Sequence, residues 1–259
     1  NASKAKQATS RQKELERMQL EKFKPSSRVA PYIRFENKEK LGEKVIEAHD
    51  IAKSYDEELF KDLSIHIGND EKVAILGPNG AGKTTLVKGL IKQLEMDKGT
   101  VEHGETVEVS YFPQDSTDLV HGDFTAIDWL AQYVRTGESI TETELRSAMG
   151  RMLFSGEDVN KPVTVLSGGE RARLIVASML LQGANVVVLD EPTNHLDLES
   201  IEALNYALTL IEDTVIFVSH DRQFVNSLAT RILEVTPEGI TDYPGTFEEF
   251  ESWKARNKK

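Results

Sequence analysis

The stretch Gly77-Pro-Asn-Gly-Ala-Gly-Lys-Thr-Thr85 decides the fold, because its spacing is that of a phosphate-binding P-loop. An apolar run, Val73 to Leu76, precedes it, and a helix is expected over 86–94. In this order of strand, loop and helix, backbone amides can surround phosphate oxygens, and the positive end of the helix faces them. The sequence therefore predicts a nucleoside triphosphate site formed by Gly77, Pro78, Asn79, Gly80, Ala81, Gly82, Lys83, Thr84 and Thr85.

Two side chains of this loop have separate predicted tasks. Lys83 is expected to reach the β- and γ-phosphates, and the hydroxyl of Thr84 is expected to bind Mg²⁺. ATP and Mg²⁺ are therefore the predicted cofactors. An ordinary glycine turn before a helix is the alternative, and the complete spacing together with both flanks argues against it.

A second apolar run, Val186 to Leu189, ends in the acidic pair Asp190 and Glu191. A short run of β-branched residues is typical of a buried strand. At the carboxyl end of that strand, Asp190 is predicted to hold Mg²⁺, and Glu191 to orient and deprotonate an attacking water. A positioned general base is worth roughly 10² to 10⁴ in rate, so the predicted activity is ATP hydrolysis.

The most specific motif is Leu166-Ser-Gly-Gly-Glu170. Ser167 and Glu170 have capping-box spacing, and the free amides at such a helix start can bind an anion. A plain helix cap is the alternative. With this motif the chain as a whole resembles the ABC-type ATPases, whose signature is LSGGQ or LSGGE.

The resemblance implies an α/β fold of the P-loop NTPase type. Its expected parts are a RecA-like core, an antiparallel β subdomain and a helical subdomain that carries the signature, all preceded here by a basic helix. In this family the P-loop of one cassette and the signature of a second enclose each ATP. The chain has one P-loop and one signature, formed by Leu166, Ser167, Gly168, Gly169 and Glu170. It should therefore need a second cassette, from the same parent chain or from a homodimer, and alone it is expected to be a weak or inactive ATPase.

Other family elements can be carried over one by one. Gln114 resembles the Q-loop glutamine, which touches Mg²⁺ and the attacking water, and His220 resembles the histidine that contacts the γ-phosphate. The implied catalytic residues are thus Glu191, His220 and Gln114, and the implied Mg²⁺ ligands are Thr84, Gln114 and Asp190. Tyr55 matches the aromatic that stacks on adenine, with plain packing as its alternative. The D-loop position, which couples the two sites, is occupied by Asn194, His195, Leu196 and Asp197.

The run Glu191-Pro-Thr-Asn-His-Leu-Asp197 is typical of the ABC-F proteins, and the chain resembles their YbiT-like branch. The N-terminal arm with Lys24-Pro-Ser-Ser-Arg28, and the ending Tyr243-Pro-Gly-Thr-Phe-Glu-Glu-Phe250, resemble the same family. The resemblance implies two segments. Residues 1–40 would be the distal part of a basic interdomain linker, with a helix over 1–24, and residues 41–259 would be the second nucleotide-binding domain.

Charge is distributed unevenly along the chain. Its net charge is −12, yet residues 1–28 hold eight Lys or Arg against three Glu. A basic arm on an acidic body can bind nucleic acid through one element, although a solvated helix face would have the same composition. ABC-F proteins bind the ribosome, so the resemblance implies contacts to rRNA or tRNA from the linker, with Lys4, Lys6, Arg11 and Lys13 as the expected contacts.

The same observations bear on location and on competing functions. The chain has no cysteine, no apolar run that could span a membrane, no signal peptide and no initiator Met, so we expect a cytoplasmic protein seen as a fragment. Neither a membrane partner nor DNA is expected. The energy module of an ABC transporter is the alternative function. A half-site that binds nucleotide and hydrolyses nothing until paired is the non-enzymatic alternative.

Overall fold

The computed structural model describes residues 29–36, 39–134 and 139–257. Contacts divide the chain after Ala30, and the unit that begins at Pro31 is the one described below. The predicted linker helix over 1–24, and with it Lys4, Lys6, Arg11 and Lys13, lies outside the described residues.

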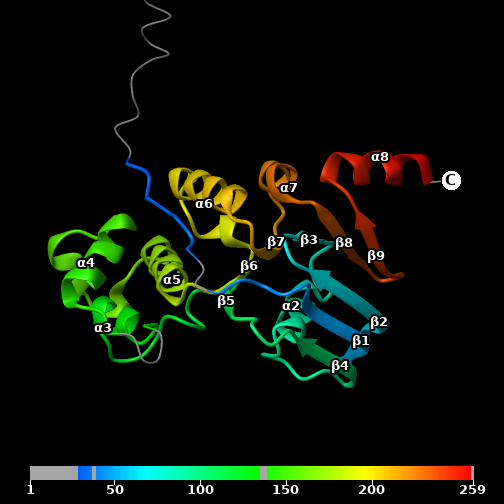
Figure 1. The fold of residues 1–259 in the computed structure, drawn as a ribbon, viewed down its shortest axis with the longest axis horizontal. Helices are drawn as coiled ribbons and strands as arrows, with labels where there is room; N and C mark the ends of the chain where they lie inside the picture. Colours follow the sequence, from blue (N-terminus) through cyan, green and yellow to red (C-terminus); the bar gives the residue numbers. More distant parts are fainter. Residues whose placement is uncertain (1–28, 37–38, 135–138, 258–259) are drawn as a thin grey trace, which may run out of the picture. The chain divides into compact units, whose positions relative to one another are not determined.

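A six-stranded sheet carries the P-loop near its centre (Figure 1). Its strands are, in spatial order, β5 (Val109–Phe112), β6 (Val186–Asp190), β7 (Thr214–Val218), β3 (Lys72–Leu76), β8 (Arg231–Thr236) and β9 (Gly239–Pro244). The first five are parallel, and β9 pairs antiparallel to β8. Every residue of β6 and β7 is buried, as their apolar runs predict.

Helices and a second sheet cover the two faces of this sheet. One face packs against α5 (Gly168–Gln182), α6 (Leu198–Leu210) and α7 (Arg222–Leu228). The other packs against α2 (Lys83–Leu90) and a three-stranded antiparallel sheet of order β2-β1-β4. That sheet consists of β1 (Lys44–Ser54), β2 (Glu58–Gly68) and β4 (Lys98–His103). The α/β fold with an antiparallel β subdomain is thereby confirmed.

A helical group completes the fold. It contains α3 (Ala126–Ala131), α4 (Glu142–Arg151) and the 3-10 turns η1 (Gly156–Asn160) and η2 (Val163–Val165), which lead into α5 and its signature. The capping box predicted for Ser167 and Glu170 is present. A third 3-10 turn, η3 (Pro192–Asn194), follows β6, and α8 (Phe247–Asn257) follows β9.

The sequence also predicts two short strands, at Val45-Ile46 and at Ala48 to Ala52, and a strand pair formed by Val101 and by Val107 to Phe112. These predictions, and the end of the helix predicted over 86–94, are wrong in three details. The runs Val45-Ile46 and Ala48 to Ala52 form the single strand β1, which is interrupted by irregular register near Asp50. The strands near Val101 and Val107 to Phe112 do not pair, because β4 joins β1 and β5 joins β6. The helix after the P-loop ends at Leu90, and the chain then turns through Lys92, whose φ of 59° is left-handed.

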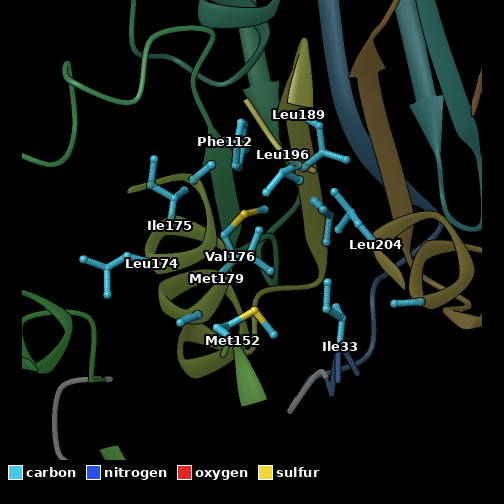
Figure 2. Close-up of a cluster of buried hydrophobic side chains, with 14 of the residues drawn as sticks. Ile33, Phe112, Met152, Leu174, Ile175, Val176, Met179, Leu189, Leu196 and Leu204 are labelled. Atoms are coloured by element: carbon cyan, nitrogen blue, oxygen red, sulfur yellow. The ribbon is translucent and has the colours of Figure 1, made fainter. Parts of the chain in front are cut away.

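The extended segment 31–36 packs on the cassette, whereas the sequence predicts that it is part of the linker. The Tyr32 amide donates to the carbonyl of Arg151 at 2.9 Å. Ile33 is only 9% exposed and lies in the same apolar cluster as Met152 and Leu204 (Figure 2). The contact boundary after Ala30 consequently falls ten residues before the expected end of the linker.

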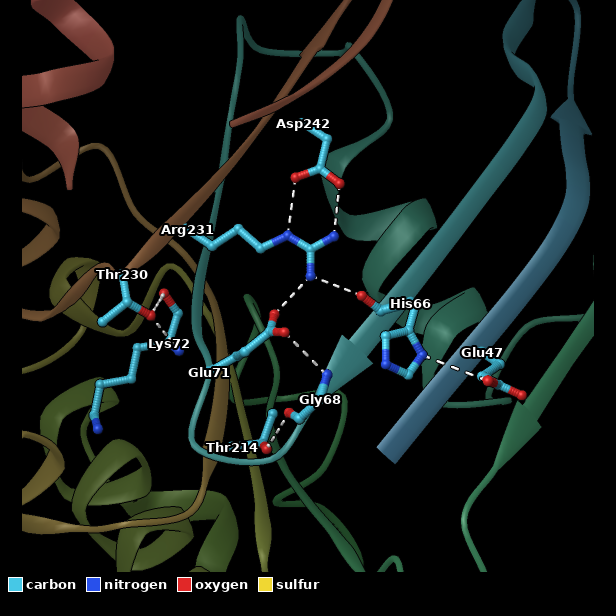
Figure 3. A network of polar contacts seen from close by, with 9 residues as sticks. All are labelled: Glu47, His66, Gly68, Glu71, Lys72, Thr214, Thr230, Arg231 and Asp242. Atoms are coloured by element: carbon cyan, nitrogen blue, oxygen red, sulfur yellow. Dashed lines mark hydrogen bonds and ion pairs between the residues drawn. The ribbon is translucent and has the colours of Figure 1, made fainter. Parts of the chain in front are cut away.

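The partly buried guanidinium of Arg231 joins the antiparallel sheet to the edge of the large sheet (Figure 3). Arg231 on β8 makes two parallel bonds to Asp242 on β9, at 2.8 and 2.6 Å. Its Nη1 donates to the carbonyl of His66 on β2 and to the carboxylate of Glu71. Because bidentate pairs of this kind fix geometry as well as adding energy, Arg231 holds β2 in a defined place against β8. No helix among the described residues has the length and apolar content needed to cross a membrane.

Candidate active site

All three glycines of the P-loop have a positive φ, and at two of them a neighbouring strand also lies close. Gly77 has a φ of 146°, and a Cβ there would lie 2.2 Å from the carbonyl oxygen of Val235 on β8. Gly82 has a φ of 95° and caps α2, with Leu59 of β2 as close as 3.2 Å to where a Cβ would stand. Gly77 therefore allows close contact with a neighbouring strand, and Gly82 lets the loop turn into the helix under β2.

A cavity of about 590 Å³ opens above this loop. P-loop residues and the carboxyl ends of β6 and β7 line it, which is where parallel sheets bind ligands. Its predicted members are Tyr55, Asn79, Gly80, Gly82, Lys83, Thr84, Thr85, Gln114, Asp190, Glu191, Asn194 and His220. Leu59 and Val218 also line it and were not predicted, since nothing distinguishes them in sequence from core residues. Gly77, Pro78 and Ala81 belong to the loop without lining the cavity.

A larger cavity, of about 750 Å³, lies between residues 32–35 and α6. Its lining contains none of the residues predicted to bind phosphate, metal or water. We therefore place the candidate active site in the cavity at the P-loop, which gathers residues predicted to bind phosphate, metal and water.

The ammonium group of Lys83 bridges two carbonyls of its own loop. Its Nζ donates to the oxygens of Gly77 and Pro78, both at 2.9 Å, and the residue is only 8% exposed. Burial lowers the pKa of Lys83, and the carboxylates of Glu191 and Asp190 oppose that change. The charge is thus held at the loop, facing the space where phosphates would lie.

Three oxygen-bearing side chains meet beside Lys83. The hydroxyl of Thr84 donates to Oε1 of Gln114 at 3.4 Å. Asp190 is fully buried, and its Oδ1 makes no hydrogen bond to any described residue. Burial raises the pKa of Asp190, and the Thr84 hydroxyl opposes the rise. Mg²⁺ prefers oxygen ligands and usually leaves most of its coordination positions to water and phosphate. These three side chains therefore fit the ion.

Glu191 is held in a strained conformation at the end of β6. Its φ of 52° is unusual for a residue with a side chain, and its amide donates to the carbonyl of Val218 at 2.9 Å. Its Oε1 lies 3.2 Å from Nε2 of His220, and its Oε2 accepts from the His220 amide at 3.3 Å. The carboxylate is 3% exposed and lines the cavity, as a general base for a bound water requires.

The D-loop joins the cavity to the signature helix. Nε2 of His195 lies 2.8 Å from the carbonyl oxygen of Gln114, and Leu196 is buried. Asp197 caps α6 and pairs with Arg173 of α5 at 3.2 Å. The three segments are therefore tied together inside one cassette.

The signature residues stand apart from the cavity. Leu166 is buried, Ser167 is exposed at the start of α5, and the capping bonds of Ser167 to Glu170 close that end of the helix. At Gly168 no atom lies within 4 Å of an added Cβ. None of Leu166, Ser167, Gly168, Gly169 and Glu170 lines the cavity at the P-loop.

Tyr55 occupies the turn between β1 and β2 at the rim of the cavity. It is 63% exposed, and the ammonium of Lys53 lies 5.6 Å from the centre of its ring. An open aromatic face at the mouth of a nucleotide site can stack on a base. The packing alternative does not describe a side chain as exposed as this one.

Comparisons with known proteins agree with this geometry. The model of the family described as "ABC transporter" matches residues 60–194. Among curated relatives, the probable ATP-binding protein YbiT of Escherichia coli O157:H7 is 47% identical, over 96% of this chain and 47% of its own length. The energy-dependent translational throttle protein EttA of Haemophilus influenzae is 42% identical, over 84% of this chain and 39% of its own. The chain thus spans about half the length of these relatives or less.

Solved structures support the fold. The ATP-binding cassette MJ0796, in a dimeric post-hydrolysis state bound to ADP and Pi, superposes with a TM-score of 0.64 at 17% identity, over 77% of this chain and 98% of its own. A bacterial Atm1-family ABC exporter with ATP bound superposes with a TM-score of 0.68 at 19% identity, over 89% of this chain and 44% of its own. At these identities the likeness is one of fold.

Proposed function

This chain belongs to the ABC transporter family of ATP-binding cassettes, and we propose that it supplies half of each of two ATP sites in a tandem-cassette ATPase that works on the ribosome. The family membership implies binding and hydrolysis of ATP. The proposal that each ATP site is shared between two cassettes rests on one observation, the separation of the signature from the cavity that gathers the other site residues.

In the proposed reaction this chain binds the triphosphate and activates water. The loop amides and Lys83 hold the phosphates, and Tyr55 stacks on the base. Mg²⁺, when bound through Thr84, Gln114 and Asp190, would neutralise charge that develops on the phosphates. Glu191 takes a proton from the water as it attacks the γ-phosphorus, and the bond from that phosphorus to ADP breaks. His220, 3.2 Å from the carboxylate, orients it and contacts the γ-phosphate.

A second cassette would complete each site. The exposed hydroxyl of Ser167 and the open surface at Gly168 are available to phosphates held by another P-loop. Because the D-loop contacts both Gln114 and α5, the partner's arrival at the signature can alter the geometry around the attacking water. Hydrolysis would then depend on pairing.

The ribosome is proposed as the partner on the strength of the relatives. EttA is named as a translational throttle protein, and YbiT shares more identity with this chain than EttA does. The basic residues Lys4, Lys6, Arg11 and Lys13 are proposed to contact the backbone of rRNA or tRNA. Ribosome contacts of this kind would be made in the cytoplasm, and binding through them would depend on salt, by about 0.7 to 0.9 in log–log slope for each neutralised phosphate.

Ribosome co-sedimentation of the parent two-cassette protein tests this role. With Glu191→Gln in this cassette and the equivalent change in the other, ATP should stay bound and most of the protein should pellet with ribosomes. The matched protein with Lys83→Ala should remain in the supernatant, because it cannot hold the nucleotide. Absence of pelleting at low salt, where phosphate contacts are strongest, would reject the ribosome and favour the energy module of a transporter.

A further inference from the structure

The buried carboxylate of Asp190 has a neighbour that the proposed reaction does not use. The hydroxyl of Tyr111, on β5, donates to Oδ2 of Asp190 across 3.5 Å. The contact is long, as hydrogen bonds at reacting sites often are before the ligands arrive. Tyr111 lies three residues before Gln114, and it does not line the cavity.

Strand register explains how the two side chains meet. Tyr111 on β5 lies beside Val188 on β6, and the two strands are parallel. Side chains alternate along a strand, so Tyr111, Val188 and Asp190 share one face of the sheet. Two residues span roughly 6.6 Å of a strand, and the long phenol bridges that interval to reach the carboxylate. A shorter donor at position 111 could not do so.

The two oxygens of Asp190 are thereby distinguished. Oδ2 accepts from the phenol, whereas Oδ1 is left without a hydrogen bond in the part of the chain described here. Asp190 is fully buried, so bulk water cannot satisfy that oxygen. Asp190, which carries Oδ1, lines the cavity together with Thr84 and Gln114.

From this arrangement we propose that Tyr111 is a positioning residue, which fixes the Asp190 carboxylate so that Oδ1 is presented to the Mg²⁺ of MgATP. The inference rests on the proposed function, because it takes Asp190 as a ligand of the ion. Partners that orient a metal-binding group are worth about 10- to 100-fold in metal affinity.

Tyr111→Phe is the direct test, because it removes only the hydroxyl and keeps the ring. Binding of a fluorescent ATP analogue to this chain is measured in EDTA and then as a function of free Mg²⁺. In EDTA the affinity should stay within about twofold of wild type. The concentration of Mg²⁺ that gives half of the metal-dependent gain in affinity should rise about 10-fold. Tyr133→Phe, which removes the hydroxyl of a half-buried tyrosine whose ring packs at a tilt against Trp129, should leave the Mg²⁺ curve unchanged.

A second variant separates positioning from packing. Asp190→Asn should abolish most of the Mg²⁺ dependence, and adding Tyr111→Phe to it should change nothing more, because the two residues act through one contact. Superimposed Mg²⁺ curves for wild type and Tyr111→Phe would overturn the inference and leave the ATP site intact. A wild-type chain that binds the analogue without any response to Mg²⁺ would overturn the role of Asp190 and the inference with it. A wild-type chain that binds no analogue at all would overturn the proposed function.

Discussion

Glu191→Gln is expected to lower ATP turnover by about 10²- to 10⁴-fold while ATP remains bound, because the amide cannot accept a proton from water. The side chain sits 3% exposed at the cavity and is held by the amide and ring of His220. Gln has the same shape and can keep a hydrogen bond to the His220 amide. The bound nucleotide should therefore keep its affinity, and the lost rate should appear in kcat.

Single-turnover hydrolysis, measured on paired cassettes, checks this expectation. Glu238→Gln is the matched control, since Glu238 is exposed in the turn between β8 and β9 and should leave the rate unchanged. Hydrolysis by Glu191→Gln at the wild-type rate would show that another group takes the proton.

Lys83→Ala is expected to weaken ATP binding by about 30- to 150-fold, which corresponds to the loss of roughly 2–3 kcal/mol from charged hydrogen bonds. The ammonium also bonds the carbonyls of Gly77 and Pro78, so its removal loosens the loop that shapes the site. ADP, which lacks the γ-phosphate, should lose less affinity than ATP.

Calorimetric titration with ATP and with ADP measures both losses. Lys98→Ala, on β4, removes one positive charge from an exposed residue that does not line the cavity, and serves as the control. Equal affinities of the Lys83→Ala and wild-type chains for ATP would mean that Lys83 serves the loop and not the phosphates.

Local sequence was sufficient to predict the parts of the site that lie on single segments. The P-loop, the strand ending in Asp190 and the cap of α5 each depend on residues close together in the chain, and the structure has all three. The predicted site residues Gln114, Glu191 and His220 lie around one cavity. They meet there because each follows one of the neighbouring parallel strands β5, β6 and β7, whose carboxyl ends lie at the same edge of the sheet. Their chemical roles remain predictions.

Pairing between distant segments could not be predicted. The strands around Val101 and Val109 have similar alternation, and alternation does not identify a partner, so their assignment to different sheets required the register with β1 and β6. For the same reason, the contact between Tyr111 and Asp190 could not be predicted. Asp190 is 79 residues away from Tyr111, and the contact depends on which residues of β5 and β6 stand opposite each other.

The segment 31–36 illustrates a different limit. Its extended run with Arg34 and Glu36 resembles a linker, yet Ile33 is buried in the same apolar cluster as Leu204. Phe35 packs against that cluster as well. The odd-numbered residues of this segment are buried or half-buried and the even-numbered ones are exposed. Alternation over six residues does not identify what the inner side chains pack against, so only the folded neighbours reveal the contact.

The central claim is that this cassette holds half of each ATP site, and mixing two inactive variants tests it most directly. Lys83→Ala removes the phosphate-binding ammonium of the P-loop and leaves the signature unchanged. Gly168→Asp places a negative charge at the signature, where an added Cβ meets no atom within 4 Å, and leaves the P-loop unchanged. Each variant alone should be inactive. An equal mixture at high protein concentration should recover about a quarter of the wild-type rate, because half of the dimers are mixed and each has one intact site of two. A Gly168→Asp chain that hydrolyses ATP at the wild-type rate, with an activity per chain that does not change on dilution, would contradict the claim.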